Sequence, residues 1–436
     1  MKLEQLLEGV PFTLAQGSLD TEISDIIYDS RKAAPGLLFV CIVGTQRDSH
    51  EFAADCAAKG VSALVIQHDI DLSAMPGVTV VKVESSRYAM ALMSANLFGN
   101  PSRKMTMIGV TGTKGKTTTT HMIKSVLEAA GRKVGMIGTN GIYYMGRHKE
   151  TANTTPESYE LQKTFREFLD AGCDTALMEV SSQGLMMDRV AGIHYKVGVF
   201  TNLYPDHIGP GEHSSFEEYR SWKGKLFQRC DVGVVNADDP NTEALLEGHT
   251  CKLVTYGIHA PKVDYRASEQ YRLLRNKEML GVEFTLTEPD GHTLDVQVGM
   301  PGLFSIYNAL ATIGVGKVLG LADAPIHEGL KKALVKGRVE LVPISHKFTI
   351  LIDYAHNEAA TESLIETLRE YNPNRLVVVF GCGGNRSKLR RYGMGEVCAK
   401  LADFSILTED NNRFEKVEDI IADIKTGMAK GNPDAK

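Results

Sequence analysis

Apolar and polar positions in the middle of the chain alternate between two kinds of segment. Short, nearly continuous apolar runs at residues 105–110, 133–139 and 174–182 predict strands, and stretches with helical spacing at residues 117–130 and 156–172 predict helices between them. Strands that are apolar on both faces and alternate with helices are typical of a parallel sheet covered by helices on both sides. The pattern therefore predicts an α/β fold with a parallel central sheet.

The pattern changes at two points, which predicts three domains. Residues 23–83 contain short strands and one helix, and a cluster of turn-forming residues follows at 99–102. In residues 262–298 apolar and polar residues alternate, which predicts strands that are polar on one face. A second α/β series begins after residues 336–338. For a chain of 436 residues we expect an N-terminal α/β domain at 1–100, a central domain at 101–336 and a C-terminal α/β domain at 337–436.

Composition and charge exclude several classes of protein. With 43% hydrophobic and 23% charged residues, the chain is typical of a folded globular protein. The formal net charge of −6 argues against nucleic-acid binding, which needs a basic face. The N-terminal residues are too acidic for a signal peptide and no apolar run approaches transmembrane length, so we expect a cytoplasmic protein without membrane contacts. Seven widely spaced cysteines without a C-x-x-C pair predict reduced thiols.

The first strand of the central domain runs into the sequence TGTKGKTTTT, which predicts a phosphate-binding loop. Gly112 and Gly115 let backbone N–H groups turn towards an anion, and the helix beginning near Thr117 adds its positive end. Lys116 supplies a charge for the outer phosphates of ATP, and the Thr117 hydroxyl suits the accompanying Mg²⁺. The first glycine of the general pattern G-x-x-x-x-G-K-[ST] is replaced by valine here, so an ordinary glycine-rich turn is the alternative.

Polar residues follow several of the predicted parallel strands. Ligands bind outside the carboxyl ends of such strands, so we expect one site near the phosphate loop that gathers Glu179, Ser181, Asn202, Asp206 and His207. A buried carboxylate is costly unless a cation meets it, so Glu179 is a candidate Mg²⁺ ligand, with a structural salt bridge as the alternative. His207 is a second candidate ligand, with a hydrogen-bonded loop histidine as the alternative.

Ordered motifs along nearly the whole chain resemble those of the Mur ligases. They are the DSR at 29–31, TGTKGKTTTT at 111–120, NTTPE at 153–157, MEVSSQGL at 178–185, FTNLYPDH at 200–207, the Y-x-x-x-K of Tyr219 to Lys223, NADDP at 236–240, KGR at 336–338, DYAHN at 353–357 and GCGGNRSKLRR at 381–391. The resemblance implies a three-domain architecture, in which an N-terminal domain binds a UDP-linked substrate, a central domain with a phosphate loop binds ATP, and a Rossmann-like C-terminal domain binds an amino acid.

The same resemblance implies an ATP-dependent amide ligase of peptidoglycan synthesis. In such an enzyme ATP phosphorylates the free carboxylate of UDP-N-acetylmuramoyl-L-alanyl-D-glutamate, and the amine of the third amino acid of the stem peptide attacks the acyl phosphate. We therefore expect ATP and Mg²⁺ as cofactors. The expected partners are UDP-muramoyl-dipeptide, an amino acid and ATP, and we expect a monomer.

Matching position by position, the resemblance implies roles for individual residues. The ATP site would comprise Gly112, Thr113, Lys114, Gly115, Lys116, Thr117, Thr118, Asn308, Arg338, Asp353 and His356. The metal ligands would be Thr117, Glu179, His207 and, if carbamylated, Lys223, and the catalytic set would be Lys116, Glu179, His207, Lys223 and Arg338. The UDP-linked substrate would contact Ser30, Thr45, Gln46, Arg47, Asn153, Thr154, Thr155, Ser181 and Arg189. The amino acid would contact Arg386, Asp410, Asn411 and Arg413.

Departures from the family pattern leave alternatives open. Arg386 and residues 410–413 resemble the pocket of ligases that use meso-diaminopimelate, whose extra carboxylate suits an arginine fork, but Asn412 replaces the usual proline and L-lysine stays the alternative. Gln183 and Met187 also replace the usual residues. A ligase with another acceptor, as in folylpolyglutamate or cyanophycin synthetases, and a nucleotide-binding paralogue without turnover are therefore further hypotheses. The chain ends before the final strands and the Gly-His-Glu segment of the family, so a truncated third domain also stays open.

Overall fold

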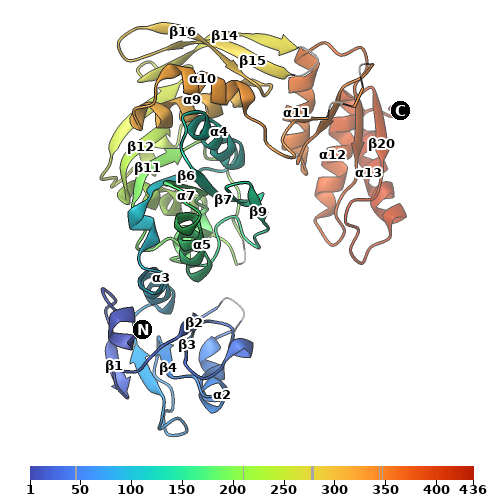
Figure 1. Ribbon diagram of the computed structural model, residues 1–436. Helices are drawn as coiled ribbons and strands as arrows, with labels where there is room; N and C mark the ends of the chain where they lie inside the picture. The colour runs from blue at the N-terminus through green and yellow to red at the C-terminus, as the bar shows by residue number, and fades with distance from the viewer. Residues whose placement is uncertain (45–46, 210, 276–278, 343, 346) are drawn as a thin grey trace. The chain divides into compact units, whose positions relative to one another are not determined.

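The computed structural model describes residues 1–44, 47–209, 211–275, 279–342, 344–345 and 347–436. The chain forms two compact units. The first consists of Met1–Glu269, Leu286–Thr293 and Tyr307–Leu330, and the second of Gln270–Thr285, Leu294–Ile306 and Lys331–Lys436. Both units combine helices and strands, as predicted, and the course of the chain can be followed in Figure 1.

The N-terminal part of the first unit is a five-stranded sheet with helices on both faces. Its elements are α1 (Leu3–Leu6), β1 (Thr13–Gln16), β2 (Asp25–Ile27), β3 (Leu37–Val40), α2 (Ala53–Ala58), β4 (Ala63–Ile66), β5 (Thr79–Lys82) and α3 (Ser86–Leu97), and the strand order is β1-β5-β4-β3-β2. Alternate strand residues face opposite sides, so Leu38 and Val40 pack with α1 and α3 while Phe39 packs with α2. This arrangement explains why the inner strands β3 and β4 are apolar throughout.

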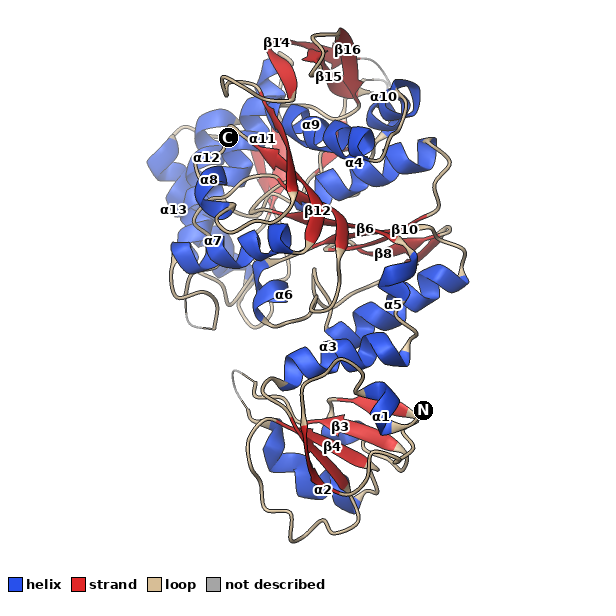
Figure 2. Ribbon diagram, turned by 90° about the vertical axis from the view of Figure 1, so that its left-hand side faces the viewer, coloured by secondary structure: helices blue, strands red, loops and turns tan. Residues whose placement is uncertain are grey.

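The central part of the first unit contains the predicted parallel sheet. Strands β6 (Thr106–Thr111), β7 (Val134–Gly138), β10 (Thr175–Glu179), β11 (Tyr195–Phe200), β12 (Cys230–Asn236) and β13 (Lys252–Gly257) pair in parallel in the order β13-β12-β11-β6-β10-β7. The helices connecting them are α4 (Lys116–Ala129), α5 (Ser158–Asp170), α6 (Ser182–Met186), α7 (Phe216–Gly224) and α8 (Thr242–Leu245). Figure 2 shows helices on both sides of this sheet. Strand β6, which carries the phosphate loop, lies between β11 and β10.

Further strands extend the sheet at both edges, antiparallel beside β7 and parallel beside β13. At one edge β7 is followed by β8 (Gly141–Tyr144) and β9 (Arg147–Lys149), a hairpin that was not predicted. At the other edge lie β14 (Tyr265–Arg275), β15 (Leu280–Thr287) and β16 (Thr293–Val298), where alternating strands and a hairpin turn were expected. Helices α9 (Leu303–Val318) and α10 (Asp323–Lys332) follow.

The second unit ends in a smaller α/β arrangement. It contains β17 (Glu340–Val342), β18 (Ile350–Ile352), α11 (Glu358–Glu370), β19 (Val377–Phe380), α12 (Lys388–Leu401), β20 (Phe404–Leu407) and α13 (Val417–Gly431). Strands β17 and β18 pair antiparallel, and β19 and β20 pair in parallel. Helices α12 and α13 pack through Met394, Ile420 and Ile424.

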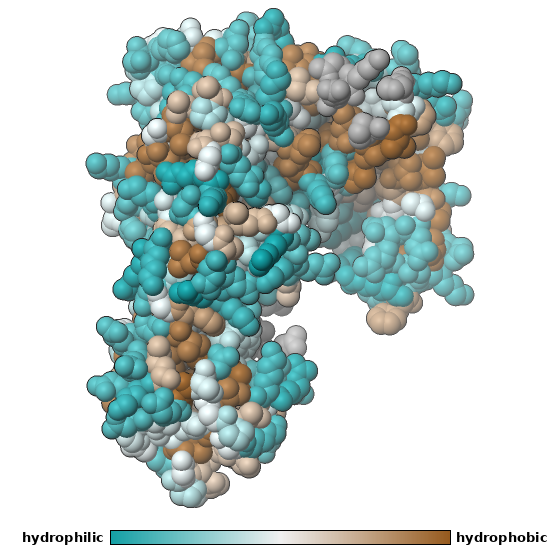
Figure 3. Space-filling model, viewed as in Figure 1, coloured by the Kyte–Doolittle hydropathy of each residue, from teal (hydrophilic) through white to brown (hydrophobic). Residues whose placement is uncertain are grey.

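One predicted helix differs from the structure in detail, and one helix was not predicted. Helix α5 begins at Ser158 rather than at Pro156, because Glu157 has extended backbone angles and serves as the residue before the first turn. The structure also contains α13, which the sequence analysis did not identify. No helix among the described residues has the length and apolarity needed to cross a membrane. Hydrophilic residues cover much of the face drawn in Figure 3, with groups of apolar residues between them.

Candidate active site

The phosphate loop lies between β6 and α4, as predicted. Gly112 and Gly115 have backbone φ angles of 150° and 83°, which residues other than glycine rarely adopt. A Cβ atom on Gly112 would also overlap the Thr201 hydroxyl, and one on Gly115 would come within 2.7 Å of Oδ1 of Asn308. Because α4 begins at Lys116, the unpaired N–H groups of its first turn face the loop. The local structure is therefore that of an anion-binding loop.

Two lysines point at one carbonyl group of this loop. The Nζ atoms of Lys116 and Lys223 each donate a hydrogen bond to the Gly112 carbonyl oxygen, both at 2.9 Å. Lys223 is only 2% exposed and lies over the Tyr219 ring, with Nζ 4.5 Å from its centroid. Burial, and next the charge of Lys116, lower the pKa of Lys223 well below its ordinary value. Lys116 brings a positive charge to the loop, whereas burial favours the neutral amine of Lys223.

Groups from the segment after β11 and from α7 hold the loop from outside. The Thr113 hydroxyl lies 3.1 Å from the Tyr219 hydroxyl and accepts a hydrogen bond from the Tyr204 N–H group at 3.0 Å. Asn202 binds both backbone groups of Lys114, accepting from its N–H at 2.9 Å and donating to its carbonyl at 3.1 Å. Loop geometry is thus fixed without a bound phosphate. The remaining loop residue, Thr118, is buried in the first turn of α4.

Glu179 ends β10 directly beside the phosphate loop. It is the parallel neighbour of Val110, the second-last residue of β6. The carboxylate is 1% exposed and accepts hydrogen bonds only from Thr139 among the described residues, from its N–H at 2.9 Å and its hydroxyl at 3.2 Å. The salt-bridge alternative is therefore wrong for the described part of the chain, where Glu179 has no cationic partner. A buried carboxylate with spare lone pairs fits a site for a divalent cation.

The other two predicted metal ligands lie near the loop on different elements. Thr117 is buried in the first turn of α4. Two residues later in the same helix, the Thr119 hydroxyl donates a hydrogen bond to Oδ1 of Asn308 on α9. His207 is exposed, has a φ of 55° and pairs through Nδ1 with Glu212 at 3.1 Å. Its ring lies 6.1 Å from the Tyr219 ring, which in turn reaches the phosphate loop through Thr113. The environment of His207 is that of a loop histidine with an accessible ring.

Residues predicted for the acceptor substrate gather around the end of β10. The buried Thr155 hydroxyl donates to the Glu179 carbonyl and accepts from the Ser181 N–H group, both at 3.0 Å. Thr154 reaches the Thr139 hydroxyl at 3.0 Å, and Arg189 donates to the Thr155 carbonyl at 3.0 Å. Asn153, which is exposed, precedes them in the chain. Glu179, the predicted metal ligand, therefore lies in direct contact with the residues predicted to bind the acceptor.

The residues predicted for the uridine-diphosphate end lie in the N-terminal sheet. Ser30 begins a short 3₁₀ turn after β2, and its carbonyl accepts from Lys59 at 3.1 Å. Arg47 is exposed, and its carbonyl accepts a hydrogen bond from the Gly44 N–H group at 2.9 Å. Thr45 and Gln46 lie outside the described residues.

The second unit contains the remaining predicted nucleotide residues. The guanidinium carbon of Arg338 lies 4.9 Å from the centroid of the Tyr354 ring. Asp353 accepts from the N–H groups of Val339 and Ala355 at 2.8 and 2.7 Å, which joins the segment after β18 to the chain just after Arg338. His356 contacts the Tyr354 carbonyl at 3.1 Å. Arg338, Asp353 and His356 thus form one local group.

The residues predicted to bind the amino acid lie on two adjoining loops of the same unit. The loops follow β19 and β20, and the Gly384 N–H group joins them by donating to the Asn411 carbonyl at 3.1 Å. Arg386, Asp410 and Arg413 are exposed. Within the described residues neither guanidinium has a hydrogen bond or ion pair. Two exposed cations on neighbouring loops suit a ligand with more than one carboxylate.

Comparisons with known proteins agree with this arrangement. Residues 110–316 match the Mur ligase middle domain, and residues 337–435 match the Mur ligase, glutamate ligase domain. The UDP-N-acetylmuramoyl-L-alanyl-D-glutamate--2,6-diaminopimelate ligase of Caldanaerobacter subterraneus is 41% identical over 433 residues, which covers 99% of this chain and 87% of the relative. The ligase of the same name from Clostridium perfringens is 38% identical over 97% of this chain and 87% of its own.

The chain belongs to the Mur ligase family. Solved structures support the fold: one titled UDP-N-acetylmuramoyl-L-alanyl-D-glutamate--2,6-diaminopimelate ligase matches with a TM-score of 0.74 and 24% identity, covering 98% of this chain and 86% of that one. A folylpolyglutamate synthase of Mycobacterium tuberculosis, complexed with ADP and AMPPCP, matches with a TM-score of 0.63 and 17% identity over 80% of this chain and 84% of that one. The predicted three-domain Mur ligase fold class is confirmed.

Sequence reasoning missed several residues that shape the site of this Mur ligase. Tyr219 was noted only as part of a motif, yet its hydroxyl and ring contact the phosphate loop and Lys223. Glu157 binds Arg189 at 2.7 Å and so holds one of the predicted acceptor residues. The buried His213 contacts the Ser182 hydroxyl at 2.9 Å. The NTTPE motif was the only signal for Glu157, and nothing in the sequence pattern pointed to His213.

Two other features of the Mur ligase do not belong to this site. A cavity of about 370 Å³ at the β8–β9 hairpin contains none of the predicted residues. Asp48, His50 and His68 place three ligand atoms within 4.8 Å of one another. However, the Gln67 N–H group donates to Nε2 of His50 at 2.9 Å, so the proton of the neutral ring must lie on Nδ1, facing Asp48. His50 then offers no free lone pair, and the group does not fit a metal.

Proposed function

We propose that this Mur ligase is an ATP-dependent amide ligase that joins meso-diaminopimelate to UDP-N-acetylmuramoyl-L-alanyl-D-glutamate. The observation that carries the proposal is the 41% identity over 99% of the chain to a ligase named for this reaction. The two exposed arginines on adjoining loops, Arg386 and Arg413, support the choice of diaminopimelate over L-lysine, because the extra carboxylate of diaminopimelate can pair with a guanidinium.

The proposal assigns ATP to the loop between β6 and α4. Backbone N–H groups of the loop and the first turn of α4 would bind the phosphates, and Lys116 would turn from the Gly112 carbonyl towards the outer phosphates. Asn308, whose side chain lies beside Gly115, would contact the nucleotide. Arg338, Asp353 and His356 are further proposed nucleotide contacts.

The chemistry of Glu179 fits a magnesium ion. Its buried carboxylate lacks a cationic partner among the described residues, so a bound divalent ion would compensate the cost of burying the charge. Thr117, His207 and Lys223 are the other proposed ligands, and Lys223 would serve only after carbamylation, which replaces its cation with a carboxylate-like group. When bound, Mg²⁺ supplies charge neutralisation for phosphoryl transfer.

The residues of this chain then act by position and charge. Lys116 and the N–H groups of the loop stabilise the γ-phosphoryl group as it moves to a carboxylate oxygen of the acceptor, leaving ADP and an acyl phosphate. Thr155, Ser181 and Arg189 hold the acceptor next to Glu179. The amine of the amino acid, held by Arg386 and Arg413, attacks the carbonyl carbon, and phosphate leaves from the tetrahedral intermediate. No nucleophilic side chain is needed.

Each of the three domains would bind a different substrate. We propose residues 1–100 as the UDP-substrate domain, residues 101–336 as the ATP domain and residues 337–436 as the amino-acid domain.

A phosphate-release assay with a panel of acceptors and amino acids tests the proposal. We expect release only when UDP-muramoyl-dipeptide and meso-diaminopimelate are both present. Release with L-lysine instead, with a folate or cyanophycin-type acceptor instead, or ATP binding without any release, would each contradict it and would favour the corresponding alternative.

Lys116→Ala tests the assignment of the phosphate loop. We expect turnover to fall by about 10²-fold or more and nucleotide binding to weaken, because a charge aimed at the outer phosphates is lost. Binding of a fluorescent ATP analogue measures the effect. Lys124→Ala is the matched control, since Lys124 lies on the same helix and pairs with Glu128 at the surface. Equal nucleotide affinity in the two variants would contradict the assignment.

A further inference from the structure

A buried arginine lies behind the two loops proposed to bind the amino acid. Arg391, on α12, is 1% exposed, the largest side chain among those nearly fully buried. Its Nη2 atom pairs with Oε1 of Glu415 at 2.8 Å, and its Nη1 atom pairs with Oδ2 of Asp423 at 2.9 Å. Glu415 follows the loop after β20, while Asp423 lies on α13. The guanidinium therefore ties that loop to two helices.

Glu415 also reaches the other loop. The same oxygen that pairs with Arg391 accepts a hydrogen bond from the Asn385 N–H group, next to Arg386. The Asn385 side chain returns the contact, since its Oδ1 accepts from the Phe414 N–H group at 3.4 Å. One carboxylate thus connects the loop that carries Arg386 with the loop that carries Arg413.

The backbone of both loops needs such a connection. Asn385, Asn411 and Arg413 have φ angles of 52°, 43° and 52°, in the left-handed region that costs free energy for residues with a side chain. The loops also touch closely, because a Cβ atom on Gly384 would overlap the Asn412 carbonyl oxygen. Conformations of this kind persist only where surrounding contacts impose them.

We propose that the Arg391–Glu415 ion pair is a positioning device for the amino-acid substrate, which sets the distance and direction of Arg386 and Arg413 and so determines the affinity for a dicarboxylic amino acid. Neither Arg391 nor Glu415 has to touch the substrate. Arg391 is buried, and Glu415 faces it and the backbone of the neighbouring loop. The inference rests on the proposed function, because it takes the ligand of Arg386 and Arg413 to be diaminopimelate.

Glu415→Gln is the main test. Glutamine keeps the size and can still accept the Asn385 hydrogen bond, but it loses the charge that pairs with Arg391. We expect the KM for diaminopimelate to rise by on the order of tenfold or more, since small displacements of binding groups have large effects. The KM values for ATP and for UDP-muramoyl-dipeptide should stay within about twofold of the wild type. Arg391→Lys, which keeps a cation but not the two-pronged geometry, should shift the same KM in the same direction.

Glu396→Gln is the matched control. Glu396, also on α12, pairs with Lys400 at 2.6 Å and with Lys430 on α13 at 2.7 Å, so its loss weakens the same helix pair without touching either loop. We expect its KM for diaminopimelate to equal that of the wild type. Thermal unfolding of all variants, followed by circular dichroism, shows that each is folded at the assay temperature.

The possible outcomes separate the two proposals. An unchanged KM for diaminopimelate in folded Glu415→Gln, an equal rise in Glu396→Gln, or a parallel rise in all three KM values would overturn the positioning role alone. Absence of diaminopimelate-dependent phosphate release in the wild type would overturn the proposed function, and this inference with it.

Discussion

Two titratable side chains, Lys223 and Glu179, are nearly fully buried next to the loop between β6 and α4. Neither has an ion-pair partner in the part of the chain that the structure describes, although burying a charge without a partner is costly. Protein groups compensate them only partly, through the Gly112 carbonyl and through Thr139. Binding of a substrate or a divalent ion next to these two residues would reduce the cost of burying them.

The first prediction concerns Glu179→Gln. Glutamine can keep the contacts with Thr139, so we expect the variant to be at least as stable as the wild type in the absence of ligands. Turnover should nevertheless fall by about 10²-fold or more, because a proposed ligand of the Mg²⁺ ion that neutralises the transferred phosphoryl group is lost. Calorimetry and phosphate release measure the two effects. A variant that is strongly destabilised would show that Glu179 has a structural role instead.

The second prediction concerns His68 in the N-terminal sheet. The hydrogen bond with Asp48, at 2.7 Å, and the Asp69 carbonyl raise the pKa of His68 above its ordinary value of 6.5. A raised pKa contributes stability that is present below pH 6.5 and is lost as the pH rises through the folded-state value. The gap in unfolding temperature between the wild type and His68→Gln should therefore be larger at about pH 6 than at about pH 9. An equal gap at both pH values would contradict this.

At the scale of single residues, the sequence predicted those with a local signal. Gly112, Gly115 and Lys116 stand in a recognisable order between a strand and a helix, and the structure has them at the predicted junction of β6 and α4. Residues that act through distant neighbours gave no such signal. Tyr219 lies 106 positions from Thr113 in the chain, yet their hydroxyl groups are 3.1 Å apart.

At the scale of elements, the closeness of packing explains why the parallel sheet is rich in glycine. Gly135 in β7 lies under the Phe168 ring of α5, and a Cβ atom there would overlap that ring. Gly109 in β6 is similarly close to Tyr195, with a Cβ to Cε1 distance of 2.9 Å. The glycines let large aromatic side chains fill the space between sheet and helices.

The third prediction follows from this packing. Gly135→Ala should destabilise the protein by about 1–3 kcal/mol, because the Phe168 ring must move in a closely packed core. Gly77→Ala is the control, since a Cβ atom at Gly77 meets no atom within 4 Å, and its effect should stay within about 0.5 kcal/mol. Denaturant titration measures both. Similar stability of the two variants would mean that the core adapts more easily than its geometry indicates.

Elements with an uninterrupted apolar or helical pattern were predicted well, and short or polar ones were not. The strands of the parallel sheet are buried on both faces, so their sequence signal is strong. The β8–β9 hairpin was missed because β9 consists of the exposed residues Arg147–Lys149, which carry no apolar pattern. Helix α13 was missed although its buried Ile420 and Ile424 have helical spacing.

At the scale of the whole molecule, the N-terminal sheet and the central sheet of the first unit are joined by reciprocal polar contacts. Tyr28 donates to Glu160 at 2.8 Å, and Tyr159 donates to Asp25 at 2.9 Å, so each part supplies one tyrosine and one carboxylate. Helices α3 and α5 lie side by side there, as Figures 1 and 2 both show. The change of pattern near residue 100 predicted a domain boundary. The pattern could not predict these hydrogen bonds, because they join residues more than 100 positions apart in the chain.

The same contact region contains an ion-pair chain that ends at the acceptor cluster. Glu157 pairs with Arg87 of α3 at 3.2 Å and with Arg189 at 2.7 Å. All three side chains are largely buried, with exposures of 22% for Arg87, 17% for Glu157 and 15% for Arg189. The carboxylate therefore links the N-terminal sheet, which is proposed to bind the uridine-diphosphate end, to an arginine proposed to bind the muramoyl-dipeptide end.

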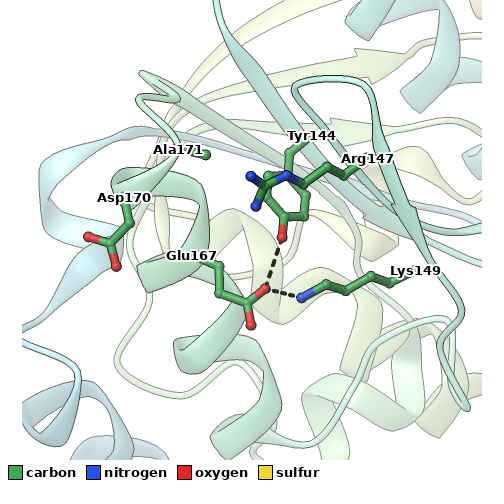
Figure 4. A pocket seen from close by; sticks show the side chains of 6 residues that line it. All are labelled: Tyr144, Arg147, Lys149, Glu167, Asp170 and Ala171. Carbon is green, nitrogen blue, oxygen red and sulfur yellow. Dashed lines mark hydrogen bonds and ion pairs between the residues drawn. The ribbon is translucent and has the colours of Figure 1, made fainter.

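The fourth prediction is that Glu157→Gln raises the KM for UDP-muramoyl-dipeptide by on the order of tenfold, because both arginines lose their charged partner and Arg189 loses its fixed direction. Glu167→Gln is the control: Glu167 lies on the same helix, but its partners are Lys149 and Tyr144 beside the hairpin cavity (Figure 4), and none of the proposed site residues is among them. Steady-state kinetics with varied acceptor distinguishes the two. If the two lobes bind the two ends of one substrate, only the Glu157 variant should need more acceptor, while its KM for ATP stays unchanged. An equal change in both variants would mean that α5 supports the site only through its stability.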